Sequence, residues 1–249
     1  MKVSIITATY NSAKTITDTL RSLELQTYPD IEYIIVDGNS SDETLEIISK
    51  NCTRISKVIS EPDNGIYDAL NKGIRAATGD IVGFLHSDDL FAYEDAVADI
   101  VSTIKESNAD AVYSDLQYVD KLDTNKVLRY WKSKEYKRES MKYGWMPPHP
   151  TFYMKKSLYE EHGLFDLSYK IAADYDSLLR YLWKGEITLC YVPTVTIKMR
   201  VGGASNRSIS NIIHKTKEDI RALNNSEVPW AKAILVKNLS KIPQFFKSV

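Results

Sequence analysis

The stretch Gly79-Asp-Ile-Val-Gly-Phe-Leu-His-Ser-Asp-Asp89 decides the fold of this 249-residue chain. Its apolar part, residues 81–85, is short and ends abruptly in polar residues, as a buried strand does. The strand places Asp88 and Asp89 at its carboxyl end, where open α/β sheets bind ligands. Adjacent carboxylates repel each other unless a cation or hydrogen bonds compensate them, and Mg²⁺ or Mn²⁺ takes oxygen ligands. Capping of a following helix by either aspartate is the alternative explanation.

Strand and helix signals alternate through the first half of the chain. Short apolar runs predict strands over 3–7, 31–36, 54–60 and 81–85, and amphipathic spacing predicts helices over 13–26, 42–50, 66–77 and 92–107. This alternation predicts a Rossmann-like α/β fold with a doubly wound, mostly parallel sheet and right-handed connections.

The rhythm changes after residue 110. Strands are predicted over 111–118, 126–131, 151–154, 187–191 and 195–199, and helices over 157–163, 172–183 and 211–223. Neither a repeat nor a long linker divides the sequence, so we expect the second half to extend the same sheet.

Composition limits the function classes. The net charge of −1 creates no field that favours nucleic acid, and 43% hydrophobic with 26% charged residues is ordinary for a globular protein. No apolar run approaches the roughly 20 residues that span a bilayer. The first strand begins within two residues of Met1, which leaves no room for a signal peptide, and the only cysteines are Cys52 and Cys190. We therefore expect a cytoplasmic protein.

The loops that follow the parallel strands meet at one sheet edge. Residues 7–11, 37–40, 61–65 and 86–89 should therefore line one crevice. A nucleotide fits this set, with Tyr10 beside the base, Asp37 on base or ribose, and Asp88 holding a metal on the diphosphate. The glycine-rich loop of a dinucleotide fold or P-loop is missing. Turn formation is the alternative for Asp37-Gly38 and for 63–65.

Several blocks in fixed order resemble family 2 glycosyltransferases with the GT-A fold, and bacterial O-antigen or surface-polysaccharide enzymes in particular. The resemblance covers residues 1–205. Its main blocks are Val3-Ser-Ile-Ile-Thr-Ala-Thr-Tyr-Asn11, Tyr33-Ile-Ile-Val-Asp-Gly-Asn-Ser-Ser-Asp42, Glu61-Pro-Asp-Asn-Gly-Ile-Tyr-Asp-Ala-Leu-Asn-Lys-Gly73 and the 79–89 stretch, followed by shorter matches at 149–153, 163–166 and 173–176.

The resemblance implies an inverting transfer from a nucleotide-diphospho sugar, expected to be a UDP-sugar, to a hydroxyl of a lipid-linked saccharide, with Mn²⁺ or Mg²⁺. The metal-binding residue would be Asp88 and the catalytic base Asp174. The nucleotide-sugar-binding residues would be Thr7, Ala8, Tyr10, Asp37, Asp63, Lys72, His86, Ser87, Asp88 and Arg200.

Two positions depart from the family pattern. His86 replaces the first carboxylate of the usual Asp-x-Asp signature, and it would hydrogen-bond ribose or phosphate, or ligate the metal. Leu70 stands where many relatives have an arginine, with Lys72 nearby as the candidate to compensate. A polyprenyl-phosphate sugar transferase and an inactive nucleotide-sugar-binding relative are the alternative functions.

The catalytic base is expected on the side of the sugar opposite the leaving diphosphate, where a carboxylate can take the proton of the attacking hydroxyl. Asp176 is the competing candidate, but it lies two helical positions from Asp174 and cannot face the same way. Capping of the helix is the structural alternative for either aspartate.

Two further loops are candidates. The proline-bracketed segment 145–150 offers Trp145 and His149 as acceptor contacts, with a purely structural histidine as the alternative. The glycine-containing segment 199–206 resembles the family's loop over the donor diphosphate, and Arg200 would pair with phosphate there; an ordinary solvated loop is the alternative.

We expect a GT-A domain over 1–205, with a nucleotide-sugar-binding half (1–110) and an acceptor-binding half (111–205), followed by a helical extension over 206–249. Residues 230–249 are basic, without an acidic residue, and carry an apolar stripe. Such a segment can lie on the cytoplasmic face of an anionic inner membrane. Packing on the protein itself or a dimer contact are the alternatives. The stripe is Leu235, Leu239, Ile242 and Phe246, and the basic residues are Lys232, Lys237, Lys241 and Lys247.

Overall fold

The computed structural model describes residues 1–202 and 209–239. Its described strands form one sheet in the order β3-β2-β1-β4-β8-β6-β9-β5, with β7 paired to β6. The strands are β1 (Val3–Thr9), β2 (Ile31–Asp37), β3 (Ile55–Ser60), β4 (Ile81–Phe84), β5 (Leu90–Phe91), β6 (Ala111–Val119), β7 (Val127–Trp131), β8 (Tyr153–Lys155) and β9 (Leu189–Arg200).

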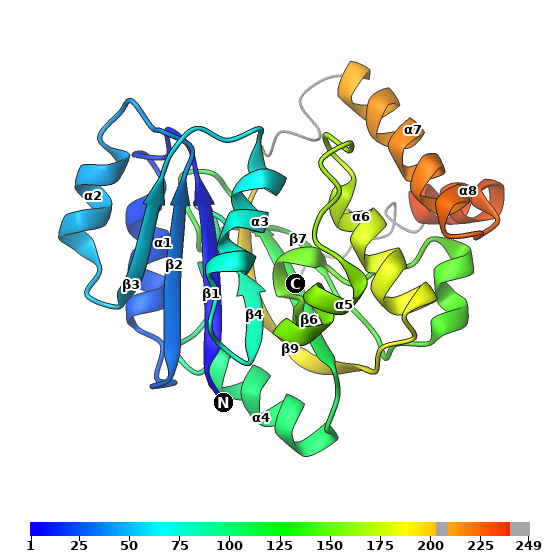
Figure 1. The fold of residues 1–249 in the computed structure, drawn as a ribbon, viewed down its shortest axis with the longest axis horizontal. Coiled ribbons are helices and arrows are strands. Elements are labelled where there is room, and N and C mark those ends of the chain that lie inside the picture. Colours follow the sequence, from blue (N-terminus) through cyan, green and yellow to red (C-terminus); the bar gives the residue numbers. More distant parts are fainter. Residues whose placement is uncertain (203–208, 240–249) are drawn as a thin grey trace.

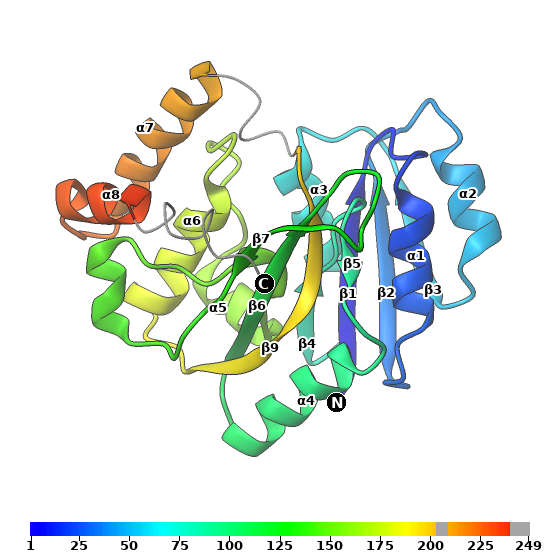
Figure 2. The same cartoon turned by 180° about the vertical axis from the view of Figure 1, so that it is seen from behind.

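Helices cover both faces of this sheet (Figures 1 and 2). They are α1 (Ile16–Glu24), α2 (Thr44–Asn51), α3 (Ile66–Ala76), α4 (Ala96–Ser107), α5 (Lys156–His162), α6 (Ala173–Leu178), α7 (Ile209–Asn225) and α8 (Trp230–Leu239). Short 3₁₀ turns span Arg138–Tyr143 and His149–Thr151, and a π-helical turn, Leu179–Lys184, continues α6.

The predicted doubly wound α/β architecture is confirmed, and the two halves of the sheet differ in pairing. Strands β3, β2, β1 and β4 are parallel, as expected from βα units. Strand β8 then lies antiparallel to both β4 and β6, and β9 runs parallel to β6. Because β8 is antiparallel to both of its neighbours, β6 runs in the same direction as β4, and β6 and β9 therefore end at the same edge as β1–β4.

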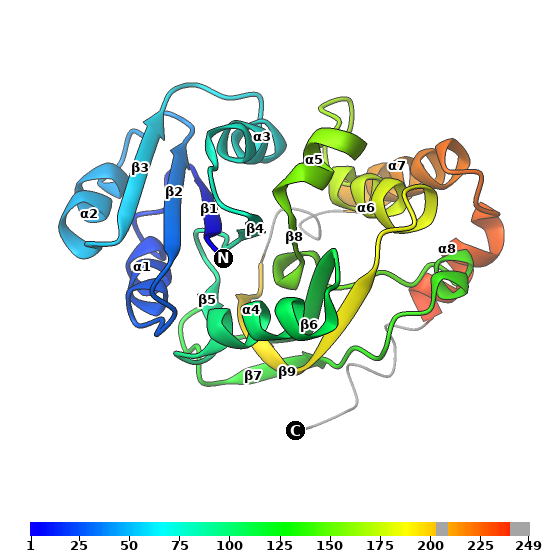
Figure 3. The ribbon, with the colours of Figure 1, turned by 60° about the horizontal axis from the view of Figure 1, so that its bottom comes forward.

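Alternation of side chains along the strands creates two cores. Ile6 and Ala8 of β1 pack with α3, α5 and α6, whereas Val3 and Ile5 face α1, α2 and α4. Helix α4 crosses β6 and β9 on the second face (Figure 3). A strand buried on both faces must be apolar almost throughout, as β1 and β4 are.

The strand predicted as two pieces, 187–191 and 195–199, is one strand with an irregularity. Pairing of β9 with β6 jumps from Ser114↔Val192 to Asp115↔Val195, and Pro193 lies in the skipped segment. Proline has no N–H to donate to a ladder, so it is tolerated at such a bulge. Helix α4 begins at Ala96 and not at residue 92, because the Ala92 amide continues the pairing of β5 with β9 by donating to the Thr196 carbonyl at 2.9 Å and residues 93–95 form a turn.

Helices α7 and α8 lie beside α6 at one end of the molecule (Figure 1). Lys237 of α8 is buried, with its Nζ 2.9 Å from Asp219 of α7 and 3.4 Å from the centre of the Tyr175 ring. One of the basic residues expected to face a membrane therefore points into the protein. Residues 240–249, which include Ile242 and Phe246 of the expected stripe and the basic residues Lys241 and Lys247, lie outside the described residues. No helix within 1–202 and 209–239 is long and apolar enough to cross a bilayer.

Candidate active site

The ends of three parallel strands align at the carboxyl edge of the sheet. Thr9 pairs with Asp37, and Asp37 pairs with Ser60. The buried Asp37 carboxylate accepts hydrogen bonds from the Ser40 amide (3.0 Å), the Ser40 hydroxyl (2.5 Å) and the Ser60 hydroxyl (2.8 Å). A carboxylate has about four lone-pair positions. Asp37 thus organises the turn, and its buried carboxylate has one lone-pair position that these three donors do not use.

Gly38, Tyr10 and Asp63 meet beside this turn. A Cβ built on Gly38 would lie 2.5 Å from Asp63 Oδ2 and 3.4 Å from the Tyr10 ring, so a side chain there would displace the Asp63 carboxylate. Tyr10 is 63% exposed, and Asp63 accepts a 2.8 Å hydrogen bond from the Gly65 amide. An open aromatic face beside a carboxylate is an arrangement that suits a nucleobase with N–H donors.

Thr7 and Ala8 lie deeper than the other predicted nucleotide residues. The Thr7 hydroxyl donates to the Leu85 carbonyl (2.6 Å) and lies 2.9 Å from the Tyr33 hydroxyl, and both Thr7 and Ala8 are buried. Their side chains belong to the core. Any contact that they make with a nucleotide would involve the backbone.

The turn after β4 carries the His86-Ser87-Asp88-Asp89 motif. The Ser87 hydroxyl is 3.0 Å from that of Ser12, which joins the turn to the loop after β1. Asp88 is half-buried, whereas both carboxylate oxygens of the buried Asp89 lack a partner among the described residues. Burial, reinforced by the charge of Asp88, raises the pKa of Asp89 well above its usual range. Asp88 is therefore the carboxylate available to a ligand.

Arg200, at the end of β9, lies behind this turn. Its Nη1 donates to the Asp88 carbonyl at 2.9 Å, its Nη2 pairs with Asp18 of α1, and it is 4% exposed. The guanidinium thus fixes the backbone of the motif. It would have to leave Asp18 to reach a phosphate.

Lys72 is also engaged with protein groups. Its ammonium donates to the Pro62 carbonyl (2.8 Å) and pairs with Glu61 at 2.9 Å. Lys72 is a residue of α3, and its ammonium contacts join α3 to the loop of residues 61–65.

Asp174 lies at the amino end of α6, facing α3. Its Oδ1 accepts a 2.8 Å hydrogen bond from the Tyr175 amide and lies 3.4 Å from the Tyr67 hydroxyl, which also donates to the Ile171 carbonyl at 2.6 Å. Asp176 is buried and pairs with Arg180 Nε at 2.9 Å, so the two aspartates point apart as expected. Burial, together with the Asp174 charge, raises the pKa of Tyr67, which keeps this hydroxyl protonated.

Two histidines lie within electrostatic reach of Asp174. His149 stacks on Phe84 with ring centres 5.4 Å apart and meets the edge of Phe165 at 5.5 Å. Burial lowers the pKa of His149 to about 4, although the charge of Asp174 acts in the opposite direction. Burial also lowers the pKa of His86, whose Nδ1 has no partner among the described residues. Both rings are therefore neutral near pH 7.

Trp145, predicted as an acceptor contact, is half-buried. Its ring centre is 5.6 Å from Tyr113 and 5.5 Å from Tyr136, and it packs against the core on the α6 side of the sheet. The half-buried Trp145 ring therefore packs against Tyr113 and Tyr136, and its acceptor contact stays a prediction.

The donor set at the β4 turn suits a divalent cation that is bound mainly by its substrate. Within the described parts of the chain no group of three or more His, Cys, Asp and Glu side chains could hold a metal ion. Magnesium commonly binds through one or two carboxylates together with substrate phosphates and water. The half-buried Asp88 carboxylate and the partnerless Nδ1 of His86 fit such a shared site.

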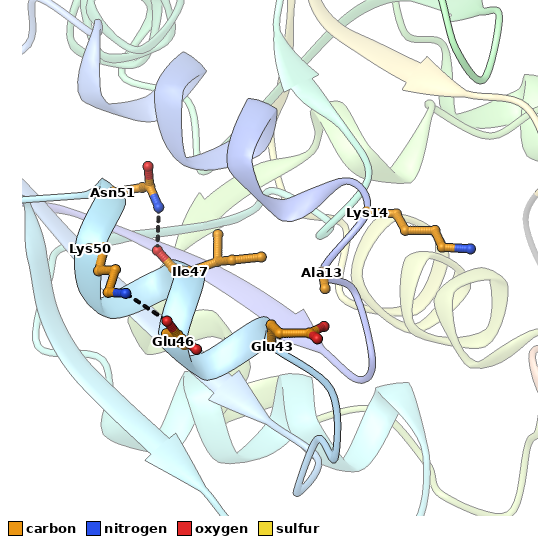
Figure 4. Close-up of a pocket in the computed structure, with 7 residues that line it drawn as sticks. All are labelled: Ala13, Lys14, Glu43, Glu46, Ile47, Lys50 and Asn51. Carbon is orange, nitrogen blue, oxygen red and sulfur yellow. Dashed lines mark hydrogen bonds and ion pairs between the residues drawn. The ribbon is translucent and has the colours of Figure 1, made fainter.

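An open hollow of about 550 Å³ lies near this edge, between the loop after β1 and helix α2 (Figure 4). Its polar lining includes the Lys50–Glu46 ion pair at 2.6 Å. None of the predicted site residues lines it, so it supports no role in the chemistry. The lining residues are Ala13, Lys14, Glu43, Glu46, Ile47, Lys50 and Asn51.

The architecture defines an open, doubly wound α/β protein with carboxylates at the carboxyl edge of its parallel strands. The chain belongs to the glycosyltransferases of family 2: the model of "Glycosyl transferase family 2" matches residues 4–163. A PGL/p-HBAD biosynthesis glycosyltransferase of Mycobacterium bovis is 30% identical over 207 residues, which are 82% of this chain and 78% of that protein. An uncharacterised glycosyltransferase of Mycobacterium tuberculosis is 32% identical over 181 residues, 72% of this chain and 68% of that protein.

Solved structures show the same GT-A fold. S. aureus TarS 1–349 in complex with UDP-GlcNAc matches with a TM-score of 0.72 and 20% identity over 98% of this chain and 78% of that one. The mannosyltransferase PcManGT from Pyrobaculum calidifontis, in complex with GDP-Man and Mn²⁺, matches with a TM-score of 0.64 and 18% identity over 100% of this chain and 76% of that one. The chain spans 43% of a longer TarS chain. The predicted fold and enzyme class are confirmed.

Two residues that hold the loop before Asp174 were missed by sequence reasoning, Tyr67 and Glu218. Tyr67 stands within the 61–73 block, but an aromatic residue at the start of an amphipathic helix is normally read as core. Glu218 lies within the predicted helix 211–223 among other charged residues, and no local pattern distinguishes it. Both act through contacts with the loop before α6, which sequence spacing does not reveal.

Proposed function

We propose that this glycosyltransferase moves one sugar, with inversion, from a UDP-sugar to a hydroxyl of a lipid-linked saccharide used to build a bacterial surface polysaccharide of the O-antigen type. The observation that carries the proposal is the gathering of Asp88, His86 and Asp174 at one edge of the sheet, where the electrostatic influence of both aspartates reaches the His86 ring. The similarity of the fold to structures in complex with UDP-GlcNAc and GDP-Man supports a nucleotide-sugar donor.

The proposed donor site lies in the half formed by residues 1–110. The base would stack beside Tyr10, with Asp63 and Asp37 as acceptors for its N–H groups or the ribose hydroxyls. Asp88 would hold Mn²⁺ or Mg²⁺ together with the diphosphate, and the metal would stabilise the charge of the leaving group. The neutral His86 would donate to ribose or phosphate or ligate the metal.

The proposed acceptor site lies between this edge and α6, in the half formed by residues 111–205. Asp174 would accept the proton of the acceptor hydroxyl while the oxygen of that hydroxyl forms a bond to the anomeric carbon of the donor sugar. The bond between the anomeric carbon and the diphosphate oxygen breaks in the same step. A positioned base contributes about 10²- to 10⁴-fold to such a step. His149, held neutral between two aromatic rings, would orient the acceptor by a hydrogen bond.

The first experiment is a thermal-shift panel of UDP-, GDP-, CMP- and dTDP-sugars, each with and without Mn²⁺. A ligand that binds only the folded state at 100 times its Kd stabilises it by about 2.7 kcal/mol. We expect a metal-dependent shift with UDP-sugars. A shift with another nucleotide class would correct the donor, and no shift with any of them would contradict the proposed donor site.

We further propose that the enzyme works on the cytoplasmic face of the inner membrane and touches it through the extension 206–249. Four large apolar residues of α7 and α8 are 45% to 61% exposed, namely Ile212, Ile213, Trp230 and Leu235. Flotation with phosphatidylglycerol vesicles tests this proposal. The double variant Trp230→Ser, Leu235→Ser should reduce vesicle binding. The control Leu122→Ser should not, because it changes a 93% exposed apolar residue in the turn between β6 and β7, outside the extension. Failure of the unchanged protein to float would refute the membrane contact.

A further inference from the structure

A buried carboxylate of α7 holds the loop that leads into α6. Glu218 is 5% exposed, and its carboxylate accepts hydrogen bonds from three consecutive backbone amides. Oε1 accepts from Lys170 at 2.8 Å, and Oε2 accepts from Ile171 and Ala172 at 2.9 Å each. Consecutive amides that converge on one anion form a rigid, charge-assisted nest.

The nest favours the ionised form of Glu218. Burial by itself would raise the pKa of this carboxyl, but the three amide donors and His214, at 3.1 Å, outweigh burial and lower it. The carboxylate is therefore charged near pH 7, and it grips the loop through hydrogen bonds of the stronger, charge-assisted kind.

The loop that Glu218 holds leads directly into the first turn of α6, which carries Asp174. Ala172 is the N-cap of α6, and Asp174 is the second residue of that helix. On its other side the same loop is fixed by Tyr67, whose hydroxyl donates to the Ile171 carbonyl at 2.6 Å. The amino end of α6 is thus held between α7 and α3.

Contacts other than those of Glu218 also dock α7. Arg221 lies 3.5 Å from the centre of the Tyr169 ring and donates to the Ser168 hydroxyl at 3.0 Å. The buried ion pair between Lys237 and Asp219 joins α8 to α7 next to Tyr175. Removal of the Glu218 carboxylate should therefore loosen the 170–172 loop while the helices stay in place.

We infer that Glu218 is a positioning residue for the proposed base Asp174, and that α7 thereby contributes to the geometry of the active site. This inference rests on the proposed function of Asp174. A misplacement of a catalytic group by about 1 Å can cost about 10²-fold in rate. Because the predicted nucleotide residues lie on other loops, the loss should fall on turnover and leave donor binding intact.

The test compares Glu218→Gln with the matched control Glu161→Gln, in which the replaced carboxylate of α5 is largely exposed. In Glu218→Gln, an amide NH₂ takes the place of one carboxylate oxygen and faces a backbone N–H, so at least one hydrogen bond is lost. Three quantities are measured: hydrogen exchange of the 170–172 amides, the Kd for UDP with Mn²⁺, and kcat and KM for release of UDP from UDP-GlcNAc, or from the donor that the thermal-shift panel selects. Asp174→Asn is assayed alongside.

For Glu218→Gln we expect faster exchange at 170–172, an unchanged Kd for UDP within about twofold, and kcat lower by about 10- to 100-fold with little change in KM. Glu161→Gln should behave as the unchanged protein. Faster exchange with unchanged kcat would overturn the positioning role, and so would exchange that stays slow. If Asp174→Asn turns over normally, the base assignment itself is wrong, whatever the result for Glu218→Gln.

Discussion

Replacement of Glu32 by glutamine is expected to remove a pH-dependent part of the stability. Glu32 of β2 is 8% exposed and lies where β1 and β4 begin. Its carboxylate accepts hydrogen bonds from the Ser4 hydroxyl (2.5 Å), the Thr78 amide (2.7 Å) and hydroxyl (2.6 Å), and Lys2 Nζ (2.9 Å). It thereby joins three chain segments at the amino edge of the parallel sheet.

The magnitude follows from the ionisation of this carboxyl. Burial would raise its pKa, but the donors outweigh burial and lower the pKa from 4.5 to about 2. A difference of this size corresponds to about 3 kcal/mol, since each pKa unit is worth about 1.4 kcal/mol. Because the folded-state pKa is the lower one, this contribution is complete above 4.5 and is lost as the pH falls toward 2.

Urea unfolding of the unchanged protein and of Glu32→Gln, at several pH values between neutrality and about pH 2.5, measures this effect. The difference in unfolding free energy should be about 3 kcal/mol near pH 7 and should shrink steadily below about pH 4.5. Glu46→Gln, at an exposed residue of α2, is the control and should change little at any pH. A difference that is small near pH 7, or that does not depend on pH, would refute the reasoning.

Three further predictions concern turnover, metal and packing. Asp174→Asn should lower kcat by about 10²- to 10⁴-fold with donor binding retained, because it removes the proposed base but keeps the shape of the side chain. Asp88→Ala should weaken binding of UDP with Mn²⁺ and leave binding without metal almost unchanged, as calorimetry would show. Gly83→Ala should destabilise the fold by about 1–3 kcal/mol or more, because the alanine Cβ would lie 1.9 Å from the buried Tyr153 ring.

Each of these predictions has its own control. Asp176→Asn should lower stability through its buried ion pair with Arg180, whereas Asp174→Asn should melt close to the unchanged protein. Equal loss of UDP binding by Asp88→Ala with and without Mn²⁺ would remove Asp88 from the metal site. An unchanged melting temperature for Gly83→Ala would show that Tyr153 can move aside.

The parallel half of the sheet and its edge could be predicted from the sequence, because both depend on local patterns. Apolar runs of strand length and amphipathic helices have characteristic periods, and βα units force the following loops to one edge. Tyr10, Asp37, Asp63 and Asp88 lie at that edge as expected. The depth of each side chain could not be predicted, because burial depends on neighbours from distant segments: Thr7 is in the core, and Arg200 and Lys72 are bound to protein groups.

The order and direction of the later strands were decided only by the tertiary structure. The three-residue β8 lies between β4 and β6 and is antiparallel to both. Such a short strand carries almost no periodic signal that would reveal its place in the sheet. The surroundings of Asp174 likewise come from segments far apart in the sequence, with Tyr67 on α3 and Glu218 on α7. The sequence by itself determined the fold class, the loops that meet and the residue types offered for chemistry, since these follow from short-range periodicity. Only the packed chain decided which carboxylates are free to react and which hold the backbone, because that depends on long-range hydrogen bonds.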